Sequence, residues 1–159
     1  LGEALMGFAG LPHRFALVAE RNQVAFINDS KATNVGSTLA ALGSLPADNQ
    51  VVLIVGGDGK GARLDALLPA MRGRIHSLVA LGKDGEHFRP LAAALERPFY
   101  DVAAMEAAVE RAAAVAPSPG IVLLSPACAS TDMFANFEAR GEAFENAVAS
   151  LALPAMSGD

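Results

Sequence analysis

Two lysines in short polar segments are the residues of this chain best suited to binding chemistry. The chain has only three lysines, and Lys31 and Lys60 each follow an apolar stretch typical of a strand. Lys31 lies in NDSKATN, residues 28–34, and Lys60 lies in GGDGKG, residues 56–61. An ammonium on a long stem offers a point charge, and glycines let backbone N–H groups approach a ligand. Both segments therefore indicate a site for an anion.

Each of these two segments also has a simpler interpretation. Residues 28–34 could be an extended helix cap, because Ser, Thr, Asp and Asn are all common there. A cap accounts for one or two of the seven residues, so a functional role is favoured. Residues 57–62 read GDGKGA and match the dinucleotide pattern G-x-G-x-x-A, or else form a solvated glycine turn. Asp84 is the only candidate for the acidic residue of a dinucleotide site, and Gly61 excludes a Walker A loop.

A third segment, SPACASTD at residues 125–132, is small and rich in hydroxyl groups. Its Cys128 could be a nucleophile, but no histidine lies near it in sequence, so a buried structural cysteine is favoured. Phe134 follows and is interpreted as a core aromatic. The three histidines are scattered without paired ligand spacing, so no metal site is predicted. Arg14 could clamp an anion or be a simple surface charge.

Alternating strands and helices must position these segments. The expected strands span residues 15–20, 23–28, 51–55, 77–82, 98–102 and 120–124. The expected helices span residues 34–45, 64–71, 85–95, which Pro90 could break, 102–115 and 138–151. The first two strands form a hairpin with a tight turn at Arg21-Asn22, and the rest predict an α/β, Rossmann-like, mostly parallel sheet flanked by helices. Ligands of such sheets bind at the carboxyl ends of strands, so the three polar segments should gather at one edge.

Length and composition limit the function classes. The 159 residues suit one domain, and a formal net charge of −5 argues against a nucleic-acid surface. No apolar run approaches the ~20 residues needed to span a bilayer, and residues 1–10 lack the basic start of a signal peptide. A single cysteine fits a reducing cytoplasm. We expect a frayed tail at residues 154–159.

Four motifs in order carry a family resemblance: GLPHR at 10–14, NDSKATN at 28–34, GGDGK at 56–60 and SPACAS at 125–130. Together they resemble the Mur ligase family, most closely the C-terminal domain of its D-glutamate-adding member. The likeness runs from about Gly10 to Leu151. It implies that residues 1–10 end an interdomain linker and that residues 11–153 form the amino-acid-binding domain, inactive without the N-terminal and central domains.

The resemblance implies a reaction in peptidoglycan biosynthesis. ATP would phosphorylate the carboxylate of UDP-MurNAc-L-alanine, and the amine of D-glutamate would attack the acyl phosphate. ATP and Mg²⁺ would be bound mainly by the central domain. The expected partners are these substrates and the enzyme's own other domains. The protein would be a cytoplasmic monomer that binds neither nucleic acid nor membrane.

The family's site residues carry over onto positions of this sequence. For D-glutamate they are Thr33, Lys60, Ser130, the backbone of Thr131, and Phe137; for the nucleotide and phosphate they are Arg14, Asp29 and Lys31. Two residues depart from the family pattern. Thr131 replaces a larger apolar residue, and Arg63 replaces an acidic one, which affects the expected shape of the glutamate pocket.

Two other functions fit parts of the sequence. Residues 57–62 would suit an NAD(P)-dependent oxidoreductase module, and the whole pattern would suit a non-catalytic α/β domain that binds a small ligand.

Overall fold

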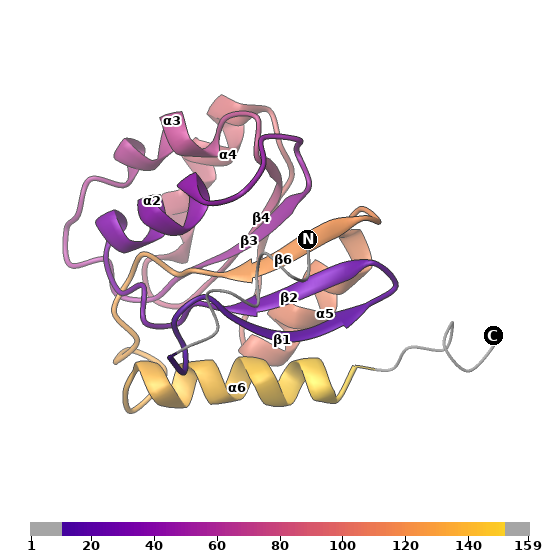
Figure 1. Cartoon of the computed structure of the whole chain (residues 1–159). Helices are drawn as coiled ribbons and strands as arrows, with labels where there is room; N and C mark the ends of the chain where they lie inside the picture. The colour runs from indigo at the N-terminus through magenta and orange to yellow at the C-terminus, as the bar shows by residue number, and fades with distance from the viewer. Residues whose placement is uncertain (1–10, 152–159) are drawn as a thin grey trace.

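A single mixed sheet organises residues 11–151, the part of the chain that the computed structural model describes (Figure 1). The linker predicted at 1–10 and the tail predicted at 154–159 lie outside this part. The strands are β1 (Ala16–Arg21), β2 (Val24–Asn28), β3 (Val51–Gly56), β4 (Ile75–Leu81), β5 (Phe99–Asp101) and β6 (Gly120–Leu124), in the order β1-β2-β6-β3-β4-β5. Only the β1–β2 pair is antiparallel, and the other four pairs are parallel. The predicted Rossmann-like fold with an N-terminal hairpin is confirmed.

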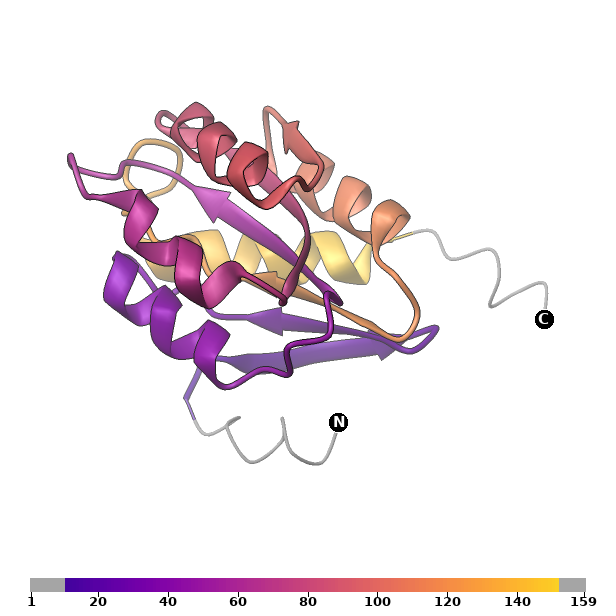
Figure 2. The same cartoon turned by 90° about the horizontal axis from the view of Figure 1, so that it is seen from above.

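Helices cover both faces of the sheet, as the view from above in Figure 2 shows. The helical elements are α2 (Val35–Gly43), η1 (Leu64–Leu67), α3 (Leu68–Met71), η2 (Gly85–Phe88), α4 (Arg89–Leu95), α5 (Met105–Val115) and α6 (Phe137–Ala149). One core lies between the sheet and α2, η1, α3, η2 and α4, and the second lies between the sheet and α5 and α6. The central strands therefore have apolar side chains on both faces.

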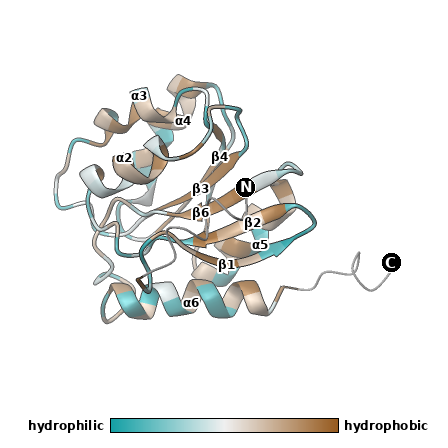
Figure 3. Ribbon diagram, in the orientation of Figure 1, coloured by the Kyte–Doolittle hydropathy of each residue, from teal (hydrophilic) through white to brown (hydrophobic). Residues whose placement is uncertain are grey.

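Burial of the central strands explains their unbroken apolar sequence. All side chains of Val51–Val55 are fully buried, and β6 is buried along its whole length. Figure 3 shows these strands as the most hydrophobic part of the ribbon, whereas α6 carries hydrophilic positions along its length. Burying each Val, Leu or Ile side chain contributes roughly 1.5–3 kcal/mol. The sheet is thus a stiff base for the loops at its ends.

The hairpin turn lies one residue later than the sequence predicts. Asn22 and Gln23 both have positive φ, 53° and 66°, which is the backbone of a two-residue hairpin turn. β1 consequently runs to Arg21, and a bulge between Leu17 and Ala19 adjusts its register with β2.

Two predicted helices are each divided into a 3₁₀ turn and an α-helix. The second of these predicted helices divides between Phe88 and Arg89, directly before Pro90, which agrees with the break predicted there. Pro90 lies in the first turn of α4, where its missing N–H leaves no hydrogen bond unmade. Asn34, the last residue of the 28–34 segment, caps α2, with its side-chain oxygen accepting a hydrogen bond from the N–H of Ser37 at 2.9 Å. The helix start beside Lys31 is therefore defined by the sequence itself.

Across residues 11–151, none of the helices combines the length and apolar character needed to cross a bilayer.

Candidate ligand site at the carboxyl edge of the sheet

The three polar loops meet at the carboxyl ends of β2, β3 and β6, as the sequence predicts. The N–H of Ala127 donates to the carbonyl of Ala32 at 3.0 Å, which joins loop 125–132 to loop 28–34. Asp58 and Ala129 exchange two backbone hydrogen bonds of 2.9 Å, which join loop 125–132 to loop 56–61. Loop 125–132 is thus the middle of the assembly, because β6 lies between β2 and β3 in the sheet.

Loop 28–34 is anchored by the side chain of Asp29. Its carboxylate accepts hydrogen bonds from the N–H of Phe15 at 3.0 Å and from the hydroxyl of Ser125 at 2.8 Å. Thr38 of α2 completes the group, because its hydroxyl donates to the carbonyl of Ser125 at 3.1 Å. Burial raises the pKa of Asp29 to about 6, although these hydrogen bonds and the charge of Arg14 oppose the rise.

A buried arginine that sequence reasoning missed holds two of the loops together. Arg140 of α6 donates to the carbonyl of Ser30 at 2.7 Å, to the hydroxyl of Ser30 at 2.9 Å and to the carbonyl of Cys128 at 2.9 Å. Burial lowers the pKa of its guanidinium to about 10, so it remains charged at neutral pH. The signal was present in the sequence: Arg140 follows Phe137 by three residues and precedes Phe144 by four, which places it on the buried face of the helix.

Contacts of Asn28 with His13 and Glu145, which the sequence did not predict, hold the segment that carries Arg14. The amide of Asn28 lies 3.0 Å from Nδ1 of His13 and donates to Oε2 of Glu145 in α6 at 2.8 Å. His13 packs edge to face against Phe137, with ring centroids 6.2 Å apart, and its backbone has a φ of 63°. The position of Arg14 is therefore set by contacts with β2 and α6.

A hollow of about 550 Å³ opens beside the start of α2, and we call it the α2 hollow. Its lining includes Arg14, Asp29, Lys31 and Thr33. All three residues predicted for the nucleotide and phosphate therefore share one cavity. Thr33, predicted for D-glutamate, lies in this same cavity. The hollow combines two cations with one buried carboxylate and a hydroxyl, a set suited to an anionic ligand that also carries hydroxyl groups.

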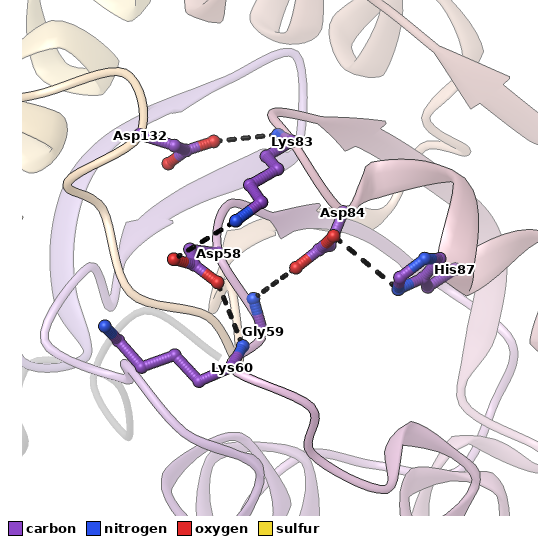
Figure 4. A network of polar contacts seen from close by, with 7 residues as sticks. All are labelled: Asp58, Gly59, Lys60, Lys83, Asp84, His87 and Asp132. Carbon is purple, nitrogen blue, oxygen red and sulfur yellow. Dashed lines mark hydrogen bonds and ion pairs between the residues drawn. The ribbon is translucent and has the colours of Figure 1, made fainter.

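Lys60 projects from residues 56–61, which we call the lysine turn. Its backbone has a φ of 52°, a left-handed conformation that lysine rarely adopts, and its N–H donates to Oδ1 of Asp58 at 3.0 Å. Figure 4 shows the side chain extending away from the neighbouring carboxylates. Within residues 11–151, no hydrogen bond or ion pair engages its ammonium group.

The other three predicted residues lie near these groups without sharing one cavity. Ser130 is 4% exposed and lines a narrow crevice beside Gly57 and Arg140 rather than the α2 hollow. Thr131 is exposed. Phe137 is the first residue of α6, and the ammonium of Lys31 lies 4.6 Å from the centre of its ring. The described structure thus brings the loops together but divides the residues between the α2 hollow and the surface around the lysine turn.

The polar groups predicted for D-glutamate share one property that the anchoring residues lack. Over residues 11–151, no hydrogen bond engages the hydroxyls of Thr33 and Ser130, and the N–H of Thr131 donates to no protein acceptor. The ammonium of Lys60 is equally unengaged, as noted above. Asp29, Asn28, Ser30 and Arg140 instead direct their polar atoms at the protein. Unengaged polar groups beside firmly hydrogen-bonded ones are what a ligand site requires.

Cys128, Phe134 and Arg63 have structural surroundings in the folded domain. Cys128 is fully buried and burial raises its pKa to about 12, which confirms a structural cysteine. Phe134 packs half-buried against the second core, as predicted. Arg63 pairs with Asp65 at 3.0 Å on the exposed surface. In the described part of the chain, no three His, Cys, Asp or Glu side chains are grouped so that they could hold a metal ion.

The dinucleotide interpretation of the glycine loop finds no support in its hydrogen bonds. Asp84, the candidate acidic residue, accepts a hydrogen bond from the N–H of Gly59 at 2.8 Å. That N–H is one of those a dinucleotide loop would turn toward the pyrophosphate. Here it is already engaged by a carboxylate.

Comparison with known sequences identifies the family. The profile described as "Mur ligase, glutamate ligase domain" matches residues 13–128. UDP-N-acetylmuramoylalanine--D-glutamate ligase of Nitrosococcus oceani is 47% identical over 145 residues, covering 91% of this chain and 32% of the relative. The protein of the same name from Pseudomonas putida is 49% identical over 154 residues, covering 94% of this chain and 34% of the relative. The chain thus spans about a third of the length of the curated relatives it matches.

Solved structures share the fold at lower identity. The crystal structure of UDP-N-acetylmuramate-alanine ligase from Thermotoga maritima has a TM-score of 0.58 at 16% identity, covering 93% of this chain and 32% of that one. Folylpolyglutamate synthase from the same organism has a TM-score of 0.59 at 15% identity, covering 89% of this chain and 31% of that one. These similarities concern the arrangement of strands and helices, including the mostly parallel sheet.

Proposed function

The chain belongs to the Mur ligase family, as a glutamate ligase domain, and we propose that it is the part of a longer ligase that binds D-glutamate. The complete enzyme would add D-glutamate to UDP-MurNAc-L-alanine in peptidoglycan biosynthesis, using ATP and Mg²⁺. Its N-terminal and central domains would bind the other substrates, and the isolated domain would be inactive. Relatives named UDP-N-acetylmuramoylalanine--D-glutamate ligase support this proposal.

The observation that carries the proposal is the set of unengaged polar groups at the carboxyl edge of the sheet. D-Glutamate has two carboxylates, so its site needs a cation and several neutral donors. Lys60 supplies an ammonium without a protein partner in the described chain, and Thr33, Ser130 and the N–H of Thr131 supply donors. Each hydrogen bond to a charged group contributes about 1.5–3 kcal/mol. Phe137 would pack against the carbon chain of the amino acid.

Nucleotide binding would use the α2 hollow. Arg14 and Lys31 line it from two different segments and could hold phosphate oxygens. Each carboxylate oxygen of Asp29 accepts one hydrogen bond from the protein, so each could accept a second one from a ribose hydroxyl. Mg²⁺ would be bound mainly by the central domain, together with ATP.

The domain would act by positioning rather than by covalent chemistry. The amine of D-glutamate must meet the acyl phosphate of UDP-MurNAc-L-alanine, which the other domains would hold. Closure of this domain over them would replace an encounter between two reactants by one bound geometry, an effect that contributes up to about 7–11 kcal/mol. The anchored loops suit that task because their backbones are already ordered.

Steady-state kinetics of the full-length ligase test the proposal. Lys60→Ala is expected to raise the KM for D-glutamate about tenfold or more, because it removes the unengaged cation. Arg89→Ala is a matched control, since it removes an exposed cation outside the three polar loops that is already paired with Glu86. The control should leave this KM within about twofold of the wild-type value. A wild-type enzyme that does not use D-glutamate rejects the function, and an unchanged KM in Lys60→Ala removes Lys60 from the site.

A further inference from the structure

Residues 82–85, the turn that leads from β4 into η2, make contact with two of the three loops that carry the proposed glutamate-binding residues, the lysine turn and loop 125–132. Asp84 of this turn accepts a hydrogen bond from the N–H of Gly59 at 2.8 Å, and its own N–H donates to the carbonyl of Gly57 at 2.8 Å (Figure 4). We infer that Asp84 is a positioning residue for Lys60 and thereby determines the affinity for D-glutamate. The inference rests on the function proposed above and adds a residue from a fourth loop to the site.

The strained backbone of Lys60 shows why a positioning residue is needed. A φ of 52° is unfavourable for lysine and persists only where the surroundings enforce it. The residue before it is held by Asp84 through the N–H of Gly59, and its own N–H is held by Oδ1 of Asp58 at 3.0 Å. Without the carboxylate of Asp84, Gly59 loses its acceptor and the lysine turn can relax. The ammonium of Lys60 would then sample many directions.

Close packing confirms that the 82–85 turn and the lysine turn fit together as one unit. Gly82 has a φ of +86°, and a Cβ placed on it would lie 2.8 Å from both Cα and N of Gly57. It would also lie 2.8 Å from Oδ2 of Asp132. The two backbones therefore touch with no room for a side chain, so a change at Asp84 reaches the lysine turn directly.

The same turn also supports the loop that carries Ser130 and Thr131. The N–H of Lys83 donates to Oδ2 of Asp132 at 2.8 Å, and its ammonium lies 3.8 Å from Oδ2 of Asp58. Lys83 thus partly neutralises Asp58, the carboxylate next to Lys60 on the lysine turn. The ammonium of Lys60 thus stays available to a ligand, because the nearby carboxylates of Asp58, Asp84 and Asp132 already accept hydrogen bonds from the protein (Figure 4).

The test compares three substitutions of Asp84 in the full-length ligase. Asp84→Ala removes the acceptor and is expected to raise the KM for D-glutamate about fivefold or more, with the KM values for ATP and for UDP-MurNAc-L-alanine within about twofold of wild type. Asp84→Asn keeps an oxygen that can accept from Gly59 and should restore most of the affinity. Asp84→Glu keeps the charge but displaces it by one methylene, so it should behave like Asp84→Ala.

Two controls separate positioning from a general loss of structure. Asp48→Ala removes an exposed carboxylate between α2 and β3, outside the polar loops, and it should leave all three KM values unchanged. The double variant Lys60→Ala/Asp84→Ala should bind D-glutamate no worse than Lys60→Ala within about twofold, because Asp84 acts through Lys60.

Several results would overturn the inference. They are a wild-type KM for D-glutamate in Asp84→Ala, an equal rise of all three KM values, or additive effects in the double variant. If Asp84→Ala does not fold, Asp84→Glu takes its place, and a wild-type KM in that variant has the same meaning. Failure of the proposed function is a distinct outcome, since then the wild-type enzyme itself shows no turnover with D-glutamate.

Discussion

The α2 hollow and the lysine turn lie at the same edge of the sheet, but different parts of the chain hold them in place. Around the hollow, buried side chains do the anchoring: Asp29 binds Ser125 and the N–H of Phe15, and Arg140 binds Ser30 and Cys128. Around the lysine turn, the backbone does most of it, through the paired bonds of Asp58 with Ala129 and the close approach of glycines.

This difference predicts how each region responds to change. A region anchored by ionisable side chains responds to pH and to loss of polar atoms, because a buried polar group without a partner is unfavourable. A region anchored by close backbone contacts responds to added atoms instead, because the packing leaves no free volume.

Adding one methyl group to the lysine turn should have the largest effect. A Cβ at Gly57 would collide with the carbonyl oxygen of Ala129, and the φ of +133° is itself unsuited to alanine. We expect Gly57→Ala to lower the free energy of unfolding by about 3 kcal/mol or more, measured by urea denaturation. Gly61→Ala is the matched control: its φ is +75° but nothing lies within 4 Å, so a loss of about 1 kcal/mol is expected. Equal losses would contradict the packing argument.

The hollow should instead show a pH-dependent stability. The pKa of Asp29 is raised from 3.8 to about 6 by burial, so the folded state retains a proton that the unfolded state has released between these values. Protonated Asp29 therefore contributes about 3 kcal/mol to the free energy of unfolding below about pH 4, and this contribution is lost as the pH rises through about 6. Asp29→Asn cannot titrate, so the difference in unfolding free energy between wild type and variant should change over this window. Parallel pH profiles would show that Asp29 ionises normally.

Removing the arginine that links the two hydroxyl-bearing loops should have the smallest of the three effects. Arg140→Met would leave the carbonyls of Ser30 and Cys128 without their donors, while relieving the burial of a cation. We expect a net loss of about 2 kcal/mol in unfolding free energy. Hydrogen exchange should report faster opening of loops 28–34 and 125–132, with the lysine turn less affected. Uniform acceleration over the whole edge would contradict the separation of the two regions.

Much of the fold was predictable because the signals are local. The apolar run Val51–Val55 is a strand buried on both faces, and Asn34 caps a helix through a hydrogen bond only three residues along. The prediction was wrong where contacts between strands determine the position of an element. The hairpin turn at Asn22 and Gln23 lies one residue later than predicted, in a hairpin whose register includes a bulge. The division of the helix predicted at 64–71 into 3₁₀ and α portions likewise has no signal in apolar spacing.

The site was predicted less completely than the fold. The four motifs drew attention to loops 28–34, 56–61 and 125–132, and the structure joins them. The sequence pattern predicted Asp84 only as a candidate dinucleotide residue, and its hydrogen bond to Gly59 spans 25 positions along the chain. It did not predict a role for Arg140, whose partner Ser30 lies 110 positions away. Such contacts depend on the order of strands, which the sequence pattern does not contain.

By itself, the sequence determined which segments become strands and helices and which loops carry hydroxyl and ammonium groups. These features follow from local propensity, apolar spacing and residue type. The tertiary structure alone decided that β6 lies between β2 and β3, that Thr33 faces the hollow of Arg14 and Lys31, and that a fourth loop holds the lysine turn. The reason is physical: hydrogen bonds and packing between distant segments depend on how the whole sheet is assembled.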